Sequence, residues 1–220
     1  MASAAAPTAQ TGDFARARRA MIDSQLRTSG INEPYLLDAF ARVPREDFVP
    51  ASARAVAYND RQIPLGGGRV MTAPLGQARL LLEAKPAATD KVLLIGGGSG
   101  YLAAVLAPLV ASLDVVESDD ALSAMAAVKA GNWHSGDLAS GWKKGAPYDL
   151  VIIDGAAEEI PAAIAKQMAE DGRLVTGTVS RGVTRIAVGR RVGNSAVLDD
   201  VADISMPVLA DFAAPKGWSF

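Results

Sequence analysis

Hydrophobic and polar positions change their period along the chain, and from residue 91 onward short apolar runs alternate with helical patterns. The runs expected as strands are 91–95, 113–117, a weaker 133–136, 148–154 and 173–178, and the helices between them are 99–110, 119–130 and 160–169. Nearly continuous apolar strands that alternate with helices are typical of a parallel sheet covered on both faces. The fold class is therefore predicted as α/β, with a doubly wound, mostly parallel sheet.

The end of the chain follows a different pattern. Strand-like runs follow one another at 184–192 and 202–209, and Gly193-Asn194 provides a turn after the first of them. Consecutive strands without an intervening helix pair antiparallel. We therefore expect antiparallel strands at one edge of the sheet.

The first 87 residues predict helices and loops rather than strands. Asp13 is expected to cap a helix that runs to about Gln25 and ends at Gly30, and Asn32 to cap a second helix that ends before Pro44. Residues 57–74 contain two prolines and three consecutive glycines and are expected as a long loop, followed by a short helix at 75–82. The predicted organisation is a disordered tail at 1–12, a helical and loop region at 13–87 that shapes a substrate site, and a core domain at 88–220.

Composition narrows the classes of function. The 220 residues carry a net charge of −2 and no cysteine, so neither a nucleic-acid-binding field nor a cysteine-based metal site is expected. The first helix is locally basic, which we interpret as a solvated face; the alternative is a polyanion site. No apolar stretch reaches membrane-spanning length, so we expect a soluble, cytoplasmic protein. We also expect a monomer without a metal, nucleic-acid or membrane partner.

A glycine-rich turn follows the first core strand and carries the most specific signal. Gly96, Gly98 and Gly100 give the spacing G-x-G-x-G, whereas the dinucleotide fingerprint G-x-G-x-x-G/A would require glycine or alanine where Tyr101 stands. The spacing therefore favours S-adenosylmethionine over NAD. A helix that starts near Ser99 presents unpaired N–H groups to the methionine carboxylate of such a ligand.

Carboxylates end the neighbouring strands, where open parallel sheets bind ligands. Glu117 lies twenty-one positions after Gly96 and is expected to accept from the ribose hydroxyls. Asp137 follows the third strand and is a candidate for the adenine amino group or a polar turn. Asp154 ends the strongest strand, near the reacting end of the cofactor, or caps the next helix. The only histidine, His134, is expected to be structural.

Several segments then show that the chain resembles the protein-L-isoaspartate O-methyltransferase family, whose fold is the Rossmann-like fold of class I methyltransferases. The V-P-R-E-x-F-V-P and A-Y-x-D-x-x-L-P-I runs of the family match 43–50 and 57–65, and its G-x-G-Q-T-I-S-x-P run is similar to 66–74. Further landmarks stand in order at 21–25, 30, 136–137, 146–149, 160–161, 167 and 172–175.

The resemblance implies a methyltransferase that uses S-adenosylmethionine to methylate the α-carboxylate of L-isoaspartyl residues in damaged proteins. The ester then closes to a succinimide, and hydrolysis returns part of it to aspartate. Thr72 stands where the family has its active-site serine; the alternative is a cap of the helix after Pro74. Asp60 matches the acidic residue of the A-Y-x-D run and is a candidate for the same pocket, or else a solvated loop carboxylate.

Three departures from the family pattern lower the expected affinity for the cofactor. Leu94 replaces an acidic residue in the first strand, Arg69 replaces a glutamine, and only nineteen positions separate Glu117 from Gly136. Two alternatives therefore stay open beside isoaspartyl methylation. One is a methyltransferase of the same fold with another carboxylate acceptor, and the other is a binding scaffold that has lost catalysis.

Overall fold

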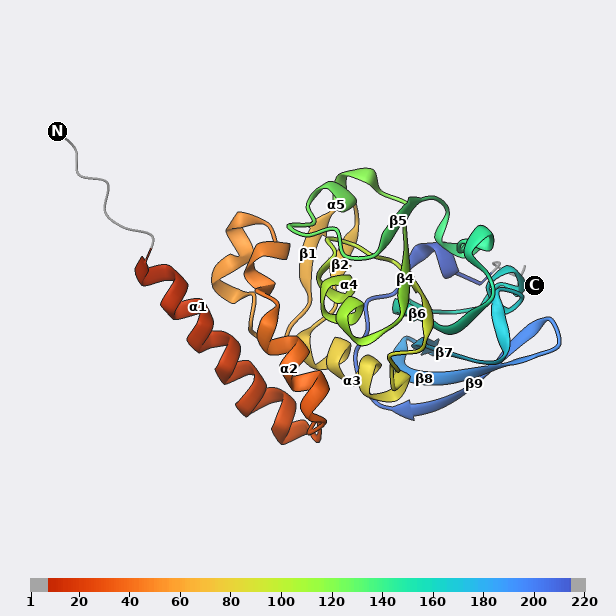
Figure 1. The fold of residues 1–220 in the computed structure, drawn as a ribbon, viewed down its shortest axis with the longest axis horizontal. Helices are drawn as coiled ribbons and strands as arrows, with labels where there is room; N and C mark the ends of the chain where they lie inside the picture. Colours follow the sequence, from red (N-terminus) through yellow and green to blue (C-terminus); the bar gives the residue numbers. More distant parts are fainter. Residues whose placement is uncertain (1–7, 215–220) are drawn as a thin grey trace.

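A seven-stranded sheet forms the centre of the molecule in the computed structural model, which describes residues 8–214 (Figure 1). The strand order is β5-β4-β3-β6-β7-β8-β9, with parallel pairing from β5 to β7 and antiparallel pairing of β8 and β9. The strands are β3 Lys91–Ile95, β4 Ser112–Glu117, β5 Asn132–Ser135, β6 Tyr148–Ala157, β7 Met168–Ser180, β8 Val183–Val192 and β9 Ser195–Ala202. The predicted doubly wound α/β class and its antiparallel edge are confirmed.

Helices and one small ribbon surround this sheet. The α-helices are α1 Thr8–Met21, α2 Pro34–Arg42, α3 Pro74–Ala84, α4 Tyr101–Leu106, α5 Asp120–Ala124 and α6 Ala162–Ala165, and the ribbon consists of β1 Ile63–Gly66 and β2 Arg69–Met71. Short 3-10 or π turns are η1 Ile22–Leu26, η2 Arg27–Ser29, η3 Arg45–Phe48, η4 Ala51–Val56, η5 Ala107–Leu109, η6 Leu138–Ser140, η7 Lys143–Gly145 and η8 Ala210–Phe212. No helix in residues 8–214 is long and apolar enough to cross a membrane.

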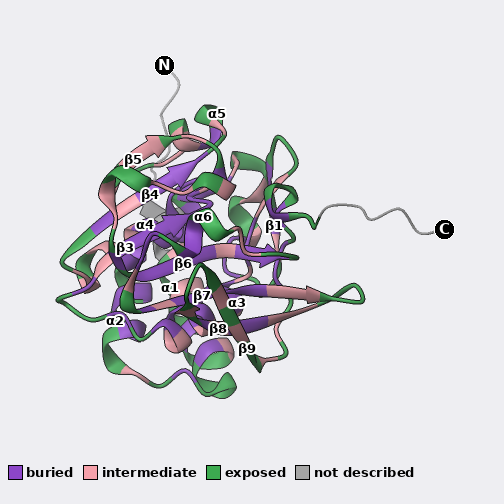
Figure 2. Ribbon diagram, turned by 90° about the vertical axis from the view of Figure 1, so that its right-hand side faces the viewer, coloured by how far each residue is buried: buried purple, intermediate pink, exposed green. Residues whose placement is uncertain are grey.

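Alternate residues of the central strands face two separate layers of the core. Leu94 and Ile152 are opposite each other on β3 and β6 and pack in one cluster with α3, α4 and the N-terminal helices. Leu93 and Val151 face the other way, towards α6 and the turns η6 and η8. The central strands are accordingly buried along most of their length in Figure 2.

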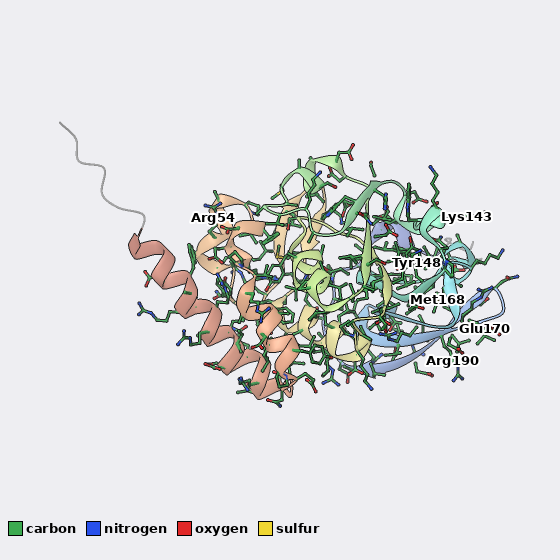
Figure 3. The ribbon with its side chains drawn as sticks, viewed as in Figure 1. Arg54, Lys143, Tyr148, Met168, Glu170 and Arg190 are labelled. Carbon is green, nitrogen blue, oxygen red and sulfur yellow. The ribbon has the colours of Figure 1, made fainter. Side chains whose placement is uncertain are left out.

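The N-terminal region belongs to the same core as the sheet. Met21, Phe40 and Phe48 are buried in the cluster that contains Leu94. Residues 13–87 and the sheet therefore share one apolar cluster. Figure 3 places Arg54, from η4, at one side of the molecule and Tyr148 and Met168, which pair at the starts of β6 and β7, at the other.

Two predicted helices are much shorter than expected. The helix predicted at 119–130 is reduced to α5, and residues 125–131 form an irregular connection that leads into β5. The prediction of 160–169 is reduced to α6, because Met168 already pairs with Tyr148 in the sheet. Sheet pairing therefore overrides the helical pattern at the second of these places.

The predicted loop at 57–74 contains a β-hairpin. Ile63 pairs with Met71, and the three glycines at 66–68 all have positive φ and form the turn between β1 and β2. The strand predicted at 202–209 is also wrong, because β9 ends at Ala202. The segment that follows crosses the end of β6, where the backbone of Ala156 pairs with Pro207 and Leu209.

The helix starts of the N-terminal region differ from the predicted caps. α1 begins at Thr8 rather than at Asp13, and residues 1–7 of the predicted tail lie outside the described residues. α2 has Glu33 rather than Asn32 at its N-cap, and Pro34 in its first turn. The predicted stop at Gly30 is present, with a φ of 86°. Arg16, Arg18 and Arg27 of the basic region each form an ion pair.

Candidate active site

The glycine-rich turn lies at the carboxyl end of β3, between β4 and β6. The chain leaves β3 towards β4 and returns to its other side as β6, so this end of the sheet is the crevice where open α/β sheets bind ligands. Gly96, Gly98 and Gly100 have φ values of 80°, 52° and 93°, which side-chain-bearing residues rarely adopt. Ser99 is buried, and its Oγ has no hydrogen-bond partner among the described residues.

Glu117 ends β4 beside this turn and is fully buried. Its Oε2 accepts from the backbone N of Gly98 at 2.6 Å, and its Oε1 accepts from the backbone N of Ser118 at 2.9 Å. Arg69 of β2 adds a two-pronged ion pair, Nη1 to Oε1 at 2.8 Å and Nη2 to Oε2 at 3.1 Å. The predicted ribose carboxylate is thus at the turn, with an arginine on it.

Asp154 in β6 forms the second polar centre of the crevice. Its Oδ1 accepts from the Thr72 hydroxyl at 2.7 Å, and its Oδ2 accepts from the Gln77 side-chain amide at 2.7 Å. Desolvation raises the pKa of Asp154, and these two hydrogen bonds oppose that rise without cancelling it. The side chain therefore does not cap a helix, and it connects β6 to the N-terminal region.

Arg45 completes this network and was not among the residues predicted for the site. Its fully buried guanidinium donates to Gln77 Oε1 and to the carbonyl oxygen of Thr72, both at 2.6 Å, and to the carbonyl oxygen of Ala57 at 2.9 Å. It lies 4.6 Å from the ring centroid of Tyr101. The resemblance at 43–50 was the available signal for Arg45, whereas nothing in the sequence pointed to Gln77.

Two predicted site residues lie away from the glycine turn. Asp60 is exposed and accepts from the backbone N of Leu75 at 3.0 Å, so it caps the start of α3 and lines a separate groove of about 400 Å³. Asp137 is also exposed and accepts from the backbone N of Ala139 at 3.2 Å, which caps η6. Asp137 thus makes the local contact of a polar turn, whereas Asp60 joins its loop to a helix that starts fourteen positions later.

Leu94 and His134 have structural surroundings. Leu94 is fully buried in the apolar cluster, so its position in β3 presents no polar atom to the crevice. His134 stacks on Trp142 with ring centroids 3.8 Å apart, and its Nε2 lies 2.8 Å from Asp114. These contacts agree with the structural role expected for the histidine.

The residue types of the crevice suit S-adenosylmethionine. A glycine turn, an unpartnered buried hydroxyl and a carboxylate at the next strand tip match a ligand with an amino-acid end and ribose hydroxyls. The space is nevertheless filled by the chain itself. A Cβ built on Gly96 would lie 3.2 Å from Arg69, and one on Gly98 would lie 3.5 Å from Leu65. The remaining cavity has a volume of about 10 Å³, which is room for one water molecule.

Comparisons with known proteins agree with the resemblance seen in the sequence. Residues 16–205 match the model of the family described as protein-L-isoaspartate(D-aspartate) O-methyltransferase. The chain is 37% identical over 199 residues to a protein-L-isoaspartate O-methyltransferase of Roseiflexus castenholzii, covering 87% of this chain and 91% of the relative. It is 32% identical over 216 residues to one of Rhodopseudomonas palustris, covering 94% and 86%.

A solved structure shows the same fold. It is that of a protein-L-isoaspartate O-methyltransferase described as putative, from Plasmodium falciparum, in complex with S-adenosyl-L-homocysteine. It superimposes with a TM-score of 0.72 at 15% identity and covers 90% of this chain and 98% of that one.

Proposed function

Because the chain belongs to the protein-L-isoaspartate(D-aspartate) O-methyltransferase family, we propose that its crevice transfers a methyl group to the α-carboxylate of L-isoaspartyl residues in damaged proteins. The protein is an S-adenosylmethionine-dependent methyltransferase, and its substrates are proteins that contain isoaspartyl residues. The observation that carries the assignment of roles is that Thr72 meets Asp154 at the end of the sheet where the glycine turn and Glu117 lie.

The glycine turn and the strand tips would hold the methyl donor. Gly96, Gly98 and Gly100 let a ligand approach the backbone, and the Oγ of Ser99 is free to bind its amino-acid end. Glu117 would accept from the ribose hydroxyls once it is released from Arg69. The donor supplies a methyl group on a sulfonium, which is a good leaving group, so the chain needs mainly to align the acceptor and exclude water.

Thr72 and Asp154 would act at the reacting end of the donor. The Thr72 hydroxyl donates to Asp154, and the Thr72 carbonyl accepts from Arg45, so both ends of the residue are held in place. The negative charge of Asp154 favours a cationic donor. An acceptor carboxylate is already ionised at neutral pH and needs no general base. The proposed reaction therefore needs no histidine, and His134 lies on β5 in contact with Asp114.

Asp60 and Asp137 lie away from the glycine turn, and we propose other roles for them. Asp60 lines the groove beside α3, together with Arg61 and Ser205, and this groove is our proposal for the path of the substrate peptide. Asp137 would reach an adenine amino group only if η6 moved, because its carboxylate now caps that turn. The monomeric state, the cytoplasmic location and the lack of nucleic-acid and membrane partners stay predictions.

The test of the function is methyl transfer to paired peptides. Radiolabelled S-adenosylmethionine is incubated with the protein and an isoaspartyl peptide, beside the matching aspartyl peptide. We expect base-labile label on the isoaspartyl peptide alone, because the product is a methyl ester. If neither peptide is labelled while the protein still binds S-adenosylhomocysteine, the acceptor is a different carboxylate.

Substitutions at Thr72 test the role of its hydroxyl. Thr72→Ala is expected to lower kcat roughly tenfold or more while the Kd for S-adenosylhomocysteine stays within about twofold, because the lost contact lies at the acceptor end. Thr72→Ser keeps the hydroxyl and is expected to retain most activity. Steady-state kinetics and calorimetry measure the two effects, and equal kcat in Thr72→Ala and the parent would remove Thr72 from the site.

A further inference from the structure

Arg69 forms an ion pair with the carboxylate that we propose as the ribose contact of the donor. The guanidinium faces Glu117 with both Nη atoms, at 2.8 and 3.1 Å, and only 14% of the Arg69 side chain is exposed. A planar guanidinium that meets both carboxylate oxygens is the strongest common form of side-chain ion pair. The contact joins residues 48 positions apart in the sequence, so it fixes the hairpin β1–β2 on the end of the sheet.

Glu117 has no acceptor capacity left in this arrangement. Besides Arg69, Oε2 accepts from Gly98 N at 2.6 Å, and Oε1 accepts from Ser118 N and Asp119 N at 2.9 and 3.2 Å. A carboxylate offers about four lone-pair sites, and six hydrogen bonds already share them when the long contact from the Ser118 hydroxyl at 3.4 Å is included. Two ribose hydroxyls can therefore bind only after the guanidinium leaves.

The same side chain also occupies the space above the glycine turn. Arg69 Nη2 would lie 3.2 Å from a Cβ on Gly96, and the cavity between the turn and the hairpin has a volume of only about 10 Å³. A nucleoside cannot enter a cavity of one water molecule. The ion pair on Glu117 and the small cavity thus both close this conformation to the donor.

Movement of Arg69 would reach the acceptor side of the crevice. The four residues from Arg69 to Thr72 cross the end of β3, because Arg69 binds Glu117 of β4 and Thr72 binds Asp154 of β6. Displacement of Arg69 would therefore move the segment that ends at Thr72. This short segment connects the donor site with the residue proposed to act on the acceptor.

We propose that Arg69 is an internal substitute for the donor's ribose, and that binding of S-adenosylmethionine displaces its guanidinium from Glu117 and releases the hairpin β1–β2 from the glycine turn. The proposal rests on the proposed function, since it takes Glu117 as the donor's ribose contact. Donor affinity is reduced by the stability of the closed ion pair, because the binding-competent state is only fractionally populated. The hairpin then adopts its catalytic position only when the donor is bound.

Calorimetric titration with S-adenosylhomocysteine tests the proposal. Arg69→Gln removes the charge and is expected to lower the Kd roughly tenfold or more, because no ion pair has to be broken. Arg69→Lys keeps the charge but loses the two-nitrogen contact of the guanidinium, so its Kd is expected to fall by less than that of Arg69→Gln. Arg27→Gln is the matched control, since it removes an exposed arginine that pairs with Asp23, and the Kd of this variant should equal that of the parent.

A double variant shows whether the effect passes through Glu117. In a Glu117→Gln background, Arg69→Gln is expected to give no gain in affinity, because the carboxylate that holds the guanidinium is gone. If Arg69→Gln does not fold, Arg69→Lys alone must bind more tightly than the parent, or the proposal is wrong.

The outcomes separate this proposal from the function on which it rests. Equal or weaker binding in a folded Arg69→Gln variant, with tight binding in the parent, overturns the role of Arg69 and leaves the methyltransferase site intact. Failure of the parent and of every Arg69 variant to bind S-adenosylhomocysteine would overturn both.

Discussion

Arg45 and Asp154 place opposite charges in the interior without touching each other. Gln77 lies between them, accepting from Arg45 at 2.6 Å and donating to Asp154 at 2.7 Å. Burial lowers the pKa of Arg45 and raises that of Asp154, and the presence of each charge opposes the shift of the other. A buried charge without compensation would be costly, so the amide bridge is what allows both residues to remain inside.

The raised pKa of Asp154 predicts a pH dependence of stability. The folded chain holds this proton more tightly than the unfolded chain, so the contribution of Asp154 is fully present below its ordinary pKa of 3.8 and is lost as pH rises through the folded pKa. Asp154→Asn does not titrate. The free energy of unfolding of Asp154→Asn minus that of the parent is therefore expected to increase from about pH 4 upward and then level off.

Urea denaturation of both proteins between pH 4 and 8 measures this difference. Only the change with pH tests the prediction, because the amide also alters the hydrogen bonds to Thr72 and Gln77 by a constant amount. A difference that stays constant or falls with pH would show that the pKa of Asp154 is not raised.

At the scale of elements, α3 connects the N-terminal region to the active site. Its N-cap, Ala73, has no side chain to bind the free N–H groups of the first turn, and Asp60 supplies the oxygen for Leu75 N from the preceding loop. Three residues into the helix, Gln77 makes the bridge between Arg45 and Asp154. The start of α3 therefore determines the position of a site residue.

Substitution of Asp60 measures this capping contact. Asp60→Ala is expected to lower the free energy of unfolding by about 1 kcal/mol, because one backbone N–H loses its acceptor. Asp60→Asn keeps an acceptor oxygen and should cost less. Chemical denaturation of the three proteins gives the values, and equal stability of Asp60→Ala and the parent would exclude a capping role.

For the whole molecule, one core joins the N-terminal helices to the sheet. Leu94 and Ile152, which face this core from β3 and β6, lie in one cluster with Met21 and Phe40, and α3 packs on β6 and β7. The face of the sheet opposite α6 is therefore covered in part by residues before 88. The predicted boundary at residue 87 separates stretches of sequence but does not separate hydrophobic cores.

A truncated chain tests this dependence. Residues 88–220 alone are expected not to form a rigid fold, because one apolar face of the sheet would be left in water. Near-UV circular dichroism and the dispersion of amide resonances are the measurements, with the full chain as the control. A well-dispersed spectrum from residues 88–220 would show that the core domain folds independently.

The sequence by itself determined the parts of the protein whose cause is local. An apolar run such as 91–95 forms a buried strand wherever a sheet exists, and glycines at 96, 98 and 100 are needed where the backbone requires positive φ. Glu117 could be placed at a strand tip for the same reason. Asp154 was expected to end its strand, but β6 continues past it to Ala157. The strands at 113–117 and 184–192 were likewise predicted nearly to the residue.

Only the tertiary structure decided which partner each buried polar group takes. The hairpin at 63–71, the shortening of α6, and the burial of Arg45 all depend on segments that are distant in the sequence. A carboxylate at a strand tip needs hydrogen bonds once it is buried. The local sequence does not determine which donor supplies them. That Arg69 takes this place on Glu117 follows from how the hairpin packs across the sheet, which no local pattern contains.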